Sequence, residues 1–175
     1  MKKKVIIVDF DDTLFFTERC TSAGSKEVVG RAMSKAAIRK LEPGIKGRVY
    51  DLSSSKYSHL SRPNRKLIRI LSRSKDSDIV VLTARTERSR RPTVALLKKH
   101  KVPFDRAIFR ENRLADTSDE IWKIGKINRF AGRYREIDFY EDKPENIAHF
   151  KHGLAHECKS TFILVEADGT HRRVV

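Results

Sequence analysis

Short apolar runs alternate with amphipathic stretches along most of the chain. The runs that have the length and composition of buried strands are residues 4–9, 77–85, 104–110 and 135–142. Between and after them, apolar residues recur at helical spacing in residues 62–74, 90–100, 117–130 and 143–153. Residues 161–175 predict a further strand that passes through an Asp-Gly turn into a second one. The pattern is therefore strand and helix in repeated alternation.

Local signals place the ends and faces of these helices. Pro63 falls in the first turn of the helix predicted over 62–74, where proline is tolerated. Ser118 is positioned to cap the helix over 117–130. The apolar stripe of that helix is predicted to be Ile121, Ile124, Ile127 and Phe130.

This alternation predicts an α/β fold, a Rossmann-like and mostly parallel sheet with helices on both faces. Ligands of such sheets bind at the carboxyl ends of the strands. Asp9, Thr83 and Asp142 each fall at the carboxyl end of a predicted strand. We therefore expect these three polar side chains to meet at one edge of the sheet.

Residues 18–61 do not fit the alternation. They contain a helix-like stretch over 25–41 and a Ser-rich stretch over 51–61. We interpret 18–61 as a small cap inserted after the first strand of a single domain that spans residues 1–175. The chain is long enough to bury a core of its own.

The charge is large and uneven. The formal net charge is +15, and residues 61–136 hold 21 Lys and Arg against 9 Asp and Glu. The excess of basic residues in 61–136 predicts an anionic partner, either nucleic acid or a small phosphorylated molecule. A basic surface that only contacts solvent would have the same composition. The apolar runs are too short to cross a bilayer, so no membrane partner is expected. The oligomeric state is left open.

The cysteines and the N-terminus predict a cytoplasmic protein. Cys20 and Cys158 are far apart and form no CxxC pair, which is typical of a reducing compartment. The first apolar run has only four residues before acids follow, so we expect no signal peptide.

Acidic residues gather where the first strand ends. Asp9, Asp11 and Asp12 lie within four positions, directly after the apolar run from Val5 to Val8. Carboxylates this close resist burial unless a cation or a proton compensates them. The run therefore predicts a functional site, and most simply one that holds a cation.

Four motifs in chain order carry a resemblance that covers residues 5–146. They are DFDDT (9–13 with the preceding strand), LTAR (82–85), WKIGKINRF (122–130) and YEDKPEN (140–146). Their order and spacing resemble the haloacid dehalogenase-like (HAD-like) phosphatase superfamily. The resemblance implies a Mg²⁺-dependent phosphomonoester hydrolase that works through an aspartyl-phosphate. Carboxylate chemistry agrees, because an ionised carboxylate can attack phosphorus and an oxygen-ligated divalent ion screens the charges.

The resemblance assigns roles to individual residues. Asp9 is implied as the nucleophile and Asp11 as the general acid and base. Thr83 is implied as a donor to the phosphoryl group, and either Lys123 or Lys126 neutralises it, with Lys123 the better match. The implied metal-binding side chains are Asp9, Asp11 and Asp142. Glu141 would hold a metal-bound water.

One position departs from the motif. Asn146 stands where the superfamily often has a second acid. Arg85 is a further candidate for substrate binding, and the resemblance does not assign it. It follows Thr83 closely enough to reach a substrate at the strand end.

The substrate stays open at this point. Residues 107–150, with Arg110 and Asp116 ahead of the lysine, also resemble the 3′-phosphatase domains of polynucleotide end-repair enzymes, more weakly than the whole chain resembles the superfamily. Arg88 and Arg91 would then contact neighbouring backbone phosphates. The alternatives are a phosphatase of small metabolites and a nucleic-acid-binding protein that keeps the fold without turnover.

Overall fold

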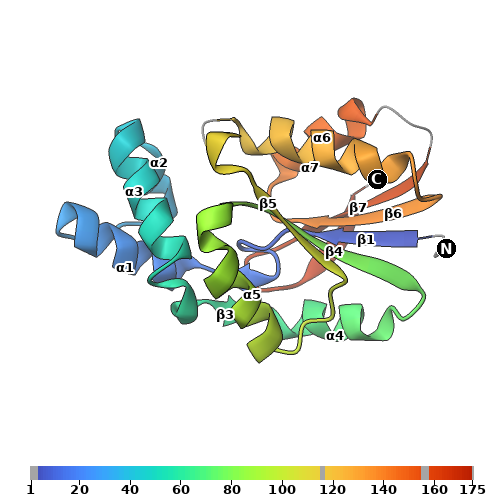
Figure 1. The fold of residues 1–175 in the computed structure, drawn as a ribbon, viewed down its shortest axis with the longest axis horizontal. Helices are drawn as coiled ribbons and strands as arrows, with labels where there is room; N and C mark the ends of the chain where they lie inside the picture. Colours follow the sequence, from blue (N-terminus) through green and yellow to red (C-terminus); the bar gives the residue numbers. More distant parts are fainter. Residues whose placement is uncertain (1–3, 115–116, 155–157, 175) are drawn as a thin grey trace.

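A six-stranded sheet forms the centre of the molecule. A computed structural model describes residues 4–114, 117–154 and 158–174. The strands lie in the order β5-β4-β1-β6-β7-β8 (Figure 1). Their bounds are β1 Lys4–Val8, β4 Ser77–Thr86, β5 Arg106–Arg110, β6 Glu136–Glu141, β7 Lys159–Val165 and β8 His171–Val174. All neighbouring strands pair in parallel except β7 and β8, which are antiparallel.

After Lys4, the central strand β1 is apolar through Val8 because both of its faces are covered. Val5, Ile7 and Val8 are fully buried in β1. β7 and β8 are joined by the turn that the Asp-Gly pair predicts. Gly169 has φ +83°, a conformation that glycine adopts without strain, and the Asp168 carboxylate accepts the Thr170 N–H at 2.8 Å.

Helices cover both faces of the sheet. α4 (Arg65–Arg73) and α5 (Arg90–Lys99) pack on one face, where Leu67, Leu71, Leu96 and Leu97 join the core. α6 (Asp119–Ala131) and α7 (Pro144–Gly153) pack on the other, through residues that include Ile127, Phe130, Ile147 and Phe150. Single 3₁₀ turns lie at η2 (Glu87–Ser89) and η3 (Asn112–Leu114). The predicted α/β fold is confirmed.

A helical segment leaves the sheet after β1 and returns before α4 (Figure 1). It contains α1 (Glu18–Val29), α2 (Lys35–Arg39), α3 (Pro43–Ser54) and the 3₁₀ turn η1 (Ser58–Leu60). The short strands β2 (Phe15–Phe16) and β3 (Arg62–Pro63) pair antiparallel at its base. α1 and α3 approach closely at Gly24, where a Cβ would lie 2.9 Å from the Val49 carbonyl oxygen.

The prediction of one helix over 25–41 is wrong. α1 ends at Gly30, which has φ 79° and donates its N–H to the Lys26 carbonyl at 3.0 Å. Glycine reaches this left-handed conformation readily and so ends helices. The Ser-rich stretch is also more regular than expected, since residues 51–54 form the last turn of α3.

Two further expectations about helices are corrected. Pro63 lies in β3, not in a helix, and α4 begins two residues later with the Asn64 side chain accepting the Leu67 N–H at 3.2 Å. Ile121 is 59% exposed, so it does not belong to the buried stripe of α6. Trp122 and Lys123 are buried in its place. The buried face of α6 is rotated because Lys123 points toward the carboxyl ends of β1 and β6.

Among the described residues, no helix has both the length and the apolar character needed to cross a membrane.

Candidate active site

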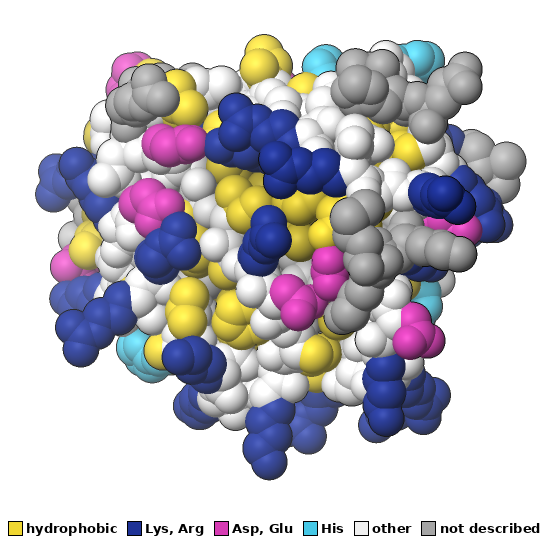
Figure 2. Space-filling view, turned by 45° about the vertical axis from the view of Figure 1, so that its right-hand side comes forward, with side chains coloured by type: hydrophobic (Ala, Val, Ile, Leu, Met, Phe, Trp, Pro, Cys, Tyr) yellow, Lys and Arg dark blue, Asp and Glu magenta, His cyan; other side chains and the backbone are white. Residues whose placement is uncertain are grey.

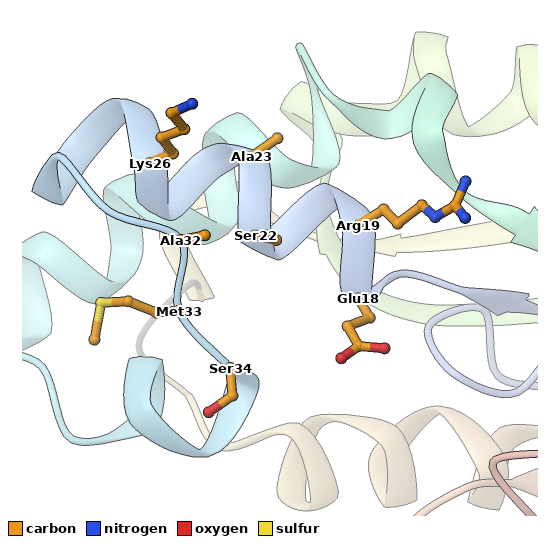
Figure 3. A pocket seen from close by; sticks show the side chains of 8 residues that line it. All are labelled: Glu18, Arg19, Ser22, Ala23, Lys26, Ala32, Met33 and Ser34. Atoms are coloured by element: carbon orange, nitrogen blue, oxygen red, sulfur yellow. The ribbon is translucent and has the colours of Figure 1, made fainter.

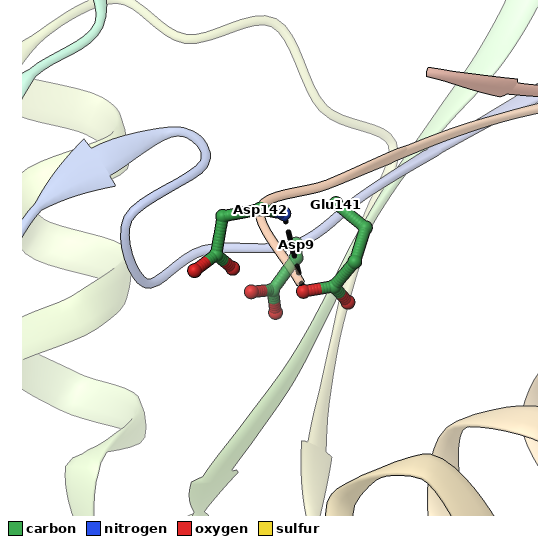
Figure 4. Close-up of side chains that lie close together, drawn as sticks. All are labelled: Asp9, Glu141 and Asp142. Carbon is green, nitrogen blue, oxygen red and sulfur yellow. Dashed lines mark hydrogen bonds between the residues drawn. The ribbon is translucent and has the colours of Figure 1, made fainter. Parts of the chain in front are cut away.

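Three carboxylates converge where β1 and β6 end. Asp9 follows β1, Glu141 is the last residue of β6, and Asp142 follows it (Figure 4). One carboxylate oxygen from each lies within 4.8 Å of the others. The backbone holds the two strand ends in register, since the Asp9 N–H donates to the Tyr140 carbonyl at 3.0 Å. The expected meeting of Asp9 and Asp142 is therefore found, with Glu141 as the third member.

Lys123 joins this carboxylate cluster from α6. Its Nζ lies 2.8 Å from Asp9 Oδ1 and 2.7 Å from Glu141 Oε2, and the side chain is 2% exposed. Glu141 is fully buried, and its other oxygen accepts the backbone N–H of Asp142 at 3.2 Å. Lys126, the alternative lysine, instead donates to Glu111 at 2.8 Å. Of the two lysines, Lys123 is the one that contacts the proposed nucleophile.

Burial in the cluster changes the pKa of each acid. Burial, together with the Glu141 and Asp11 charges, raises the pKa of Asp9 to about 7, although Lys123 opposes the shift. Burial and the Asp9 and Glu141 charges raise the pKa of Asp142 to about 9. Burial acts in the same direction on Glu141, but the Lys123 charge and the hydrogen bonds with Asp142 and Lys123 together outweigh it and lower the pKa. One ammonium therefore compensates only part of the negative charge.

A divalent ion with oxygen ligands fits this cluster. Its donors are all carboxylate oxygens, the type that hard cations such as Mg²⁺ prefer. The incomplete compensation by Lys123 is what a second cation would relieve. Asn146, on the first turn of α7, is buried, and its Nδ2 has no hydrogen-bond partner among the described residues. Asp9 and Asp142 would be the first candidates to hold such an ion.

Asp11 lies outside the carboxylate cluster. Its carboxylate receives Arg85 Nη2 at 2.8 Å and Arg85 Nε at 3.0 Å. Desolvation would raise the pKa of Asp11, but the Arg85 guanidinium lowers it below its ordinary value. The assignment of the Asp11 side chain to the metal thus rests on the resemblance alone.

Arg85 is held from several sides. Its side chain is only 4% exposed. Besides Asp11, it donates to the Ser58 and Thr93 hydroxyls, both at 3.1 Å, and its guanidinium lies 4.3 Å from the Phe10 ring centroid. In this state Arg85 positions Asp11 and links it to the helical segment, and it would have to exchange partners to bind a substrate as predicted.

Thr83 is fully buried near the end of β4. The pairing of Val8 with Val81 places Thr83 one position further along its strand than Asp9. Its hydroxyl accepts the Arg85 N–H at 3.2 Å, where the pairing of β4 with β5 shifts register between Thr83 and Thr86. The role of Thr83 as a donor to the phosphoryl group stays a prediction.

The third acid of the opening motif has a structural use that the sequence did not reveal. Asp12 has φ 61°, a conformation that Asp tolerates better than most residues. Its carboxylate accepts the Thr17 N–H at 3.1 Å and forms an ion pair with Lys35 of α2. Asp12 therefore ties the helical segment to the loop that carries Asp9 and Asp11.

A second chain of charges was also missed. Arg110 Nη2 lies 2.8 Å from Ala84 O and 2.8 Å from Asp119 Oδ1, whose other oxygen receives Lys143 Nζ at 3.2 Å. These contacts join the irregular last part of β4, the start of α6 and the loop after β6. Asp116, which was paired with Arg110 in the weaker resemblance, lies outside the described residues.

An open groove lies on the helical segment. It encloses about 570 Å³ between α1 and the segment that leads to α2 (Figure 3). Its polar lining comprises Glu18, Arg19, Ser22, Lys26 and Ser34. Because α1 begins soon after Thr13, the end of the groove at Glu18 is close in sequence to the DFDDT motif.

The basic residues are spread over the surface and many are paired. Figure 2 shows Lys and Arg side chains around much of one face, with acidic side chains between some of them. Arg88 lies 3.6 Å from Asp51 of α3, and Arg90 lies 2.6 Å from Glu87. Arg91 is exposed on α5. The predicted basic surface is thus partly occupied by contacts within the chain.

No protein-family model matches the sequence, and no curated protein matches it either. Solved structures do match the fold. A HAD-superfamily hydrolase from Geobacter sulfurreducens has 15% identity and a TM-score of 0.61, over 92% of this chain and 88% of that one. A haloacid dehalogenase-like family hydrolase from Streptococcus pneumoniae has 12% identity and a TM-score of 0.59, over 88% and 82%.

A chain of a Pnkp1/Rnl/Hen1 complex is also similar. It has 15% identity and a TM-score of 0.53, over 91% of this chain and 46% of that one. This chain therefore spans about half the length of that protein. The likenesses to the hydrolases extend over most of this chain, including its mostly parallel sheet. The chain has the fold of the haloacid dehalogenase-like superfamily.

Proposed function

We propose that the protein is a Mg²⁺-dependent phosphomonoester hydrolase that works through an aspartyl-phosphate on Asp9. The contact of Lys123 with both Asp9 and Glu141, beside Asp142, carries the proposal. It supplies a carboxylate nucleophile, a fixed positive charge and oxygen ligands for a metal within one small site. Phosphoryl transfer depends mainly on such positioning and electrostatics.

The proposed reaction has two displacements. An Asp9 oxygen bonds to phosphorus while the bond to the leaving oxygen breaks. Asp11 gives that oxygen a proton, which requires that Arg85 first leaves Asp11, because the Arg85 guanidinium lowers the pKa of this carboxyl and favours its ionised form. Asp11 then takes a proton from water, and the water oxygen attacks phosphorus, which releases phosphate and restores the Asp9 carboxylate. Lys123 and the Thr83 hydroxyl stabilise the phosphoryl oxygens. A bound divalent ion would add further charge stabilisation there.

The helical segment is proposed to act as a cap. It contacts the catalytic loop through Lys35 and Asp12, and it contacts Arg85 through Ser58. Movement of this segment would therefore be felt at Asp11. The groove along α1 gives the part of the substrate beyond the phosphate a place to lie.

Nucleic-acid or nucleotide 3′-phosphate ends are the proposed substrate class. The structural likeness to a chain of an RNA repair complex and the basic residues after Thr83 support it. A phosphatase of small metabolites is the alternative, because many of the basic side chains already have partners within the chain.

The catalytic proposal is tested by phosphate release from an aryl phosphate, with Mg²⁺ and with a chelator. We expect release that requires the metal. Asp9→Asn should abolish it, and Asp11→Asn should allow phosphoenzyme to form but slow its hydrolysis. Asp138→Asn is the matched control, since Asp138 lies in β6 and pairs with Lys4, 2.6 Å away. Normal turnover by Asp9→Asn would refute the mechanism.

The substrate class is tested with a salt series. Affinity for a 3′-phosphorylated oligonucleotide should fall by roughly 0.7 log unit per log unit of salt for each phosphate contacted. The Michaelis constant of a mononucleotide should change little. Arg88→Ala/Arg91→Ala should weaken the salt dependence for the oligonucleotide. A flat response that the double substitution leaves unchanged would favour the small-metabolite alternative.

A further inference from the structure

A hollow with a basic lining lies between α4 and the end of α5. It encloses about 340 Å³. Its basic side chains are Arg65, Arg69, Lys99, His100 and Lys101, and its apolar ones are Pro63 and Ile68. We call it the basic hollow. It belongs to the face of the sheet that α4 and α5 cover, where the His100 ring contacts the Phe15 ring and Phe15 stacks on Phe10. None of the residues that line it belongs to the carboxylate cluster.

The charges of the basic hollow are not balanced within the described part of the chain. No acidic residue lines it, and Arg65, Arg69, Lys99 and Lys101 form no ion pair there. Arg65 and Arg69 are four residues apart on α4, so they face the same side and repel each other. By contrast, Arg88 and Arg90 each lie beside a carboxylate, that of Asp51 and that of Glu87.

The backbone at Lys101 is unusual. This residue has φ 52° just after α5, where its N–H donates to the Lys98 carbonyl at 3.0 Å. Glycine or asparagine normally occupies such a helix-ending position, because other residues are strained there. A lysine at this point accepts the strain and adds one more positive charge to the hollow.

His100 forms the inner wall of the hollow. Its ring meets the Phe15 ring edge-on, with centroids 5.5 Å apart, and is half-buried. Burial lowers the pKa of His100, and the charges of Lys99 and Arg65 lower it further. An anion bound among Arg65, Arg69, Lys99 and Lys101 would oppose the electrostatic part of this shift. The pKa of His100 should therefore rise when an anion binds in the basic hollow.

We propose that the basic hollow is a second phosphate-binding site, separate from the catalytic carboxylates, and that it binds backbone phosphates of a single-stranded nucleic acid. Cations on both sides of an open hollow suit a strand with several phosphates, and Pro63 and Ile68 offer apolar contact to a sugar or base. A free polyphosphate would offer the same chemistry, and the experiment separates the two sources. The proposal does not depend on turnover.

The test uses an oligonucleotide with hydroxyl groups at both ends, which presents no phosphomonoester to the catalytic site. Binding is measured by fluorescence anisotropy over a salt series of about 50 to 200 mM. Arg65→Ala/Arg69→Ala should reduce the salt slope by about 0.7 for each phosphate that the variant no longer binds. The matched control is Arg129→Ala/Arg133→Ala, which removes two arginines at and just after the end of α6, on the opposite face. Thermal melting checks that both variants fold.

A weaker salt slope confined to the variant of the hollow supports the proposal. Equal changes in both variants, or no change in either, overturn it, because the effect would then come from net charge alone. Pyrophosphate provides the second arm, with the pKa of His100 followed by NMR. If pyrophosphate raises that pKa but the oligonucleotide neither binds through the hollow nor raises it, the site takes a small anion and the strand proposal is wrong. Phosphatase results with Asp9→Asn leave each of these outcomes unchanged.

Discussion

Two regions of the molecule each concentrate charge of one sign, and they differ in whether an opposite charge lies beside it. At the carboxylate cluster, three acids are buried around the Lys123 ammonium. At the basic hollow, four permanent cations face solvent with no acid among the lining residues. In the first region the fold itself supplies a compensating charge, and in the second it supplies none. The contrast indicates that compensation follows burial, because an unpaired charge is costly only where water is excluded.

The largest effect is expected from removing the compensating charge. Lys123→Ala leaves buried carboxylates without their partner, which should lower the free energy of unfolding by about 3 to 5 kcal/mol. It should also cost about 3 kcal/mol of transition-state stabilisation. Urea unfolding and turnover measure the two effects separately. Lys126→Ala is the control from the same helix, and equal effects in the two variants would remove the distinction between them.

The next effect concerns Arg85, which compensates Asp11 at the edge of the site. Arg85→Ala should lower the free energy of unfolding by about 2 kcal/mol, because it removes charged hydrogen bonds to Asp11, Ser58 and Thr93. Turnover should fall as well, since Asp11 is then no longer held in position. Arg85→Lys keeps the positive charge but loses the planar guanidinium that donates to Asp11 through two nitrogens. Partial recovery of stability in this variant, without recovery of turnover, would support the positioning role. Unchanged turnover in both variants would argue against it.

A smaller effect is expected at the half-exposed pair of Glu111 and Lys126. The Lys126 hydrogen bond, a contact with the backbone of Glu111 itself and the Trp122 N–H lower the pKa of Glu111 to about 2. A lowered pKa stabilises the fold above the ordinary value of 4.5, and this contribution disappears as the pH falls from 4.5 to 2. Lys126→Ala should therefore flatten that part of the stability curve, by no more than about 1 kcal/mol at this exposed site. Glu166→Gln, which alters an exposed pair with Arg172, serves for comparison.

The smallest effect has the opposite sign and belongs to the basic hollow. Arg69→Ala removes the repulsion between Arg65 and Arg69, so the free energy of unfolding should rise by about 0.2 to 0.5 kcal/mol. Added oligonucleotide should stabilise the original protein more than the variant. A loss of stability in the variant would mean that Arg69 has a packing role, and the contrast with the carboxylate cluster would weaken. Precise urea titrations with and without salt provide the measurement.

The sequence predicts the parts of the fold that depend on neighbouring residues. Apolar runs mark the parallel strands, and the positions of Asp9, Thr83 and Asp142 after those runs are enough to predict that Asp9 and Asp142 meet. The prediction for Ile121 is wrong because helical periodicity does not show which residues of the helix must face the ends of the strands. α6 is rotated so that Lys123 reaches Asp9, and Ile121 is exposed as a result.

The features that the sequence does not predict depend on contacts between residues far apart in the chain. Asp11 and Arg85 are 74 positions apart, and Asp12 and Lys35 are separated by a helix that ends at Gly30. The basic hollow is even harder to predict from the sequence, because Arg69 and Lys101 come together only after α4 and the end of α5 have packed on the sheet. Net charge predicts an anionic partner, but not where that partner would bind.

The pairing of β2 with β3 has a consequence for how this chain can be altered. Phe15 lies opposite Pro63 and Phe16 opposite Arg62, so the chain leaves for the helical segment and returns from it at the same place. A segment whose two ends are already adjacent can be lengthened, shortened or exchanged at a low entropic cost of closing the loop. The sheet and its carboxylates can therefore be kept while another insertion is grafted onto Phe16 and Arg62. Such a graft would have to supply new partners for Asp12, Arg85 and Arg88, which contact Lys35, Ser58 and Asp51 of the helical segment.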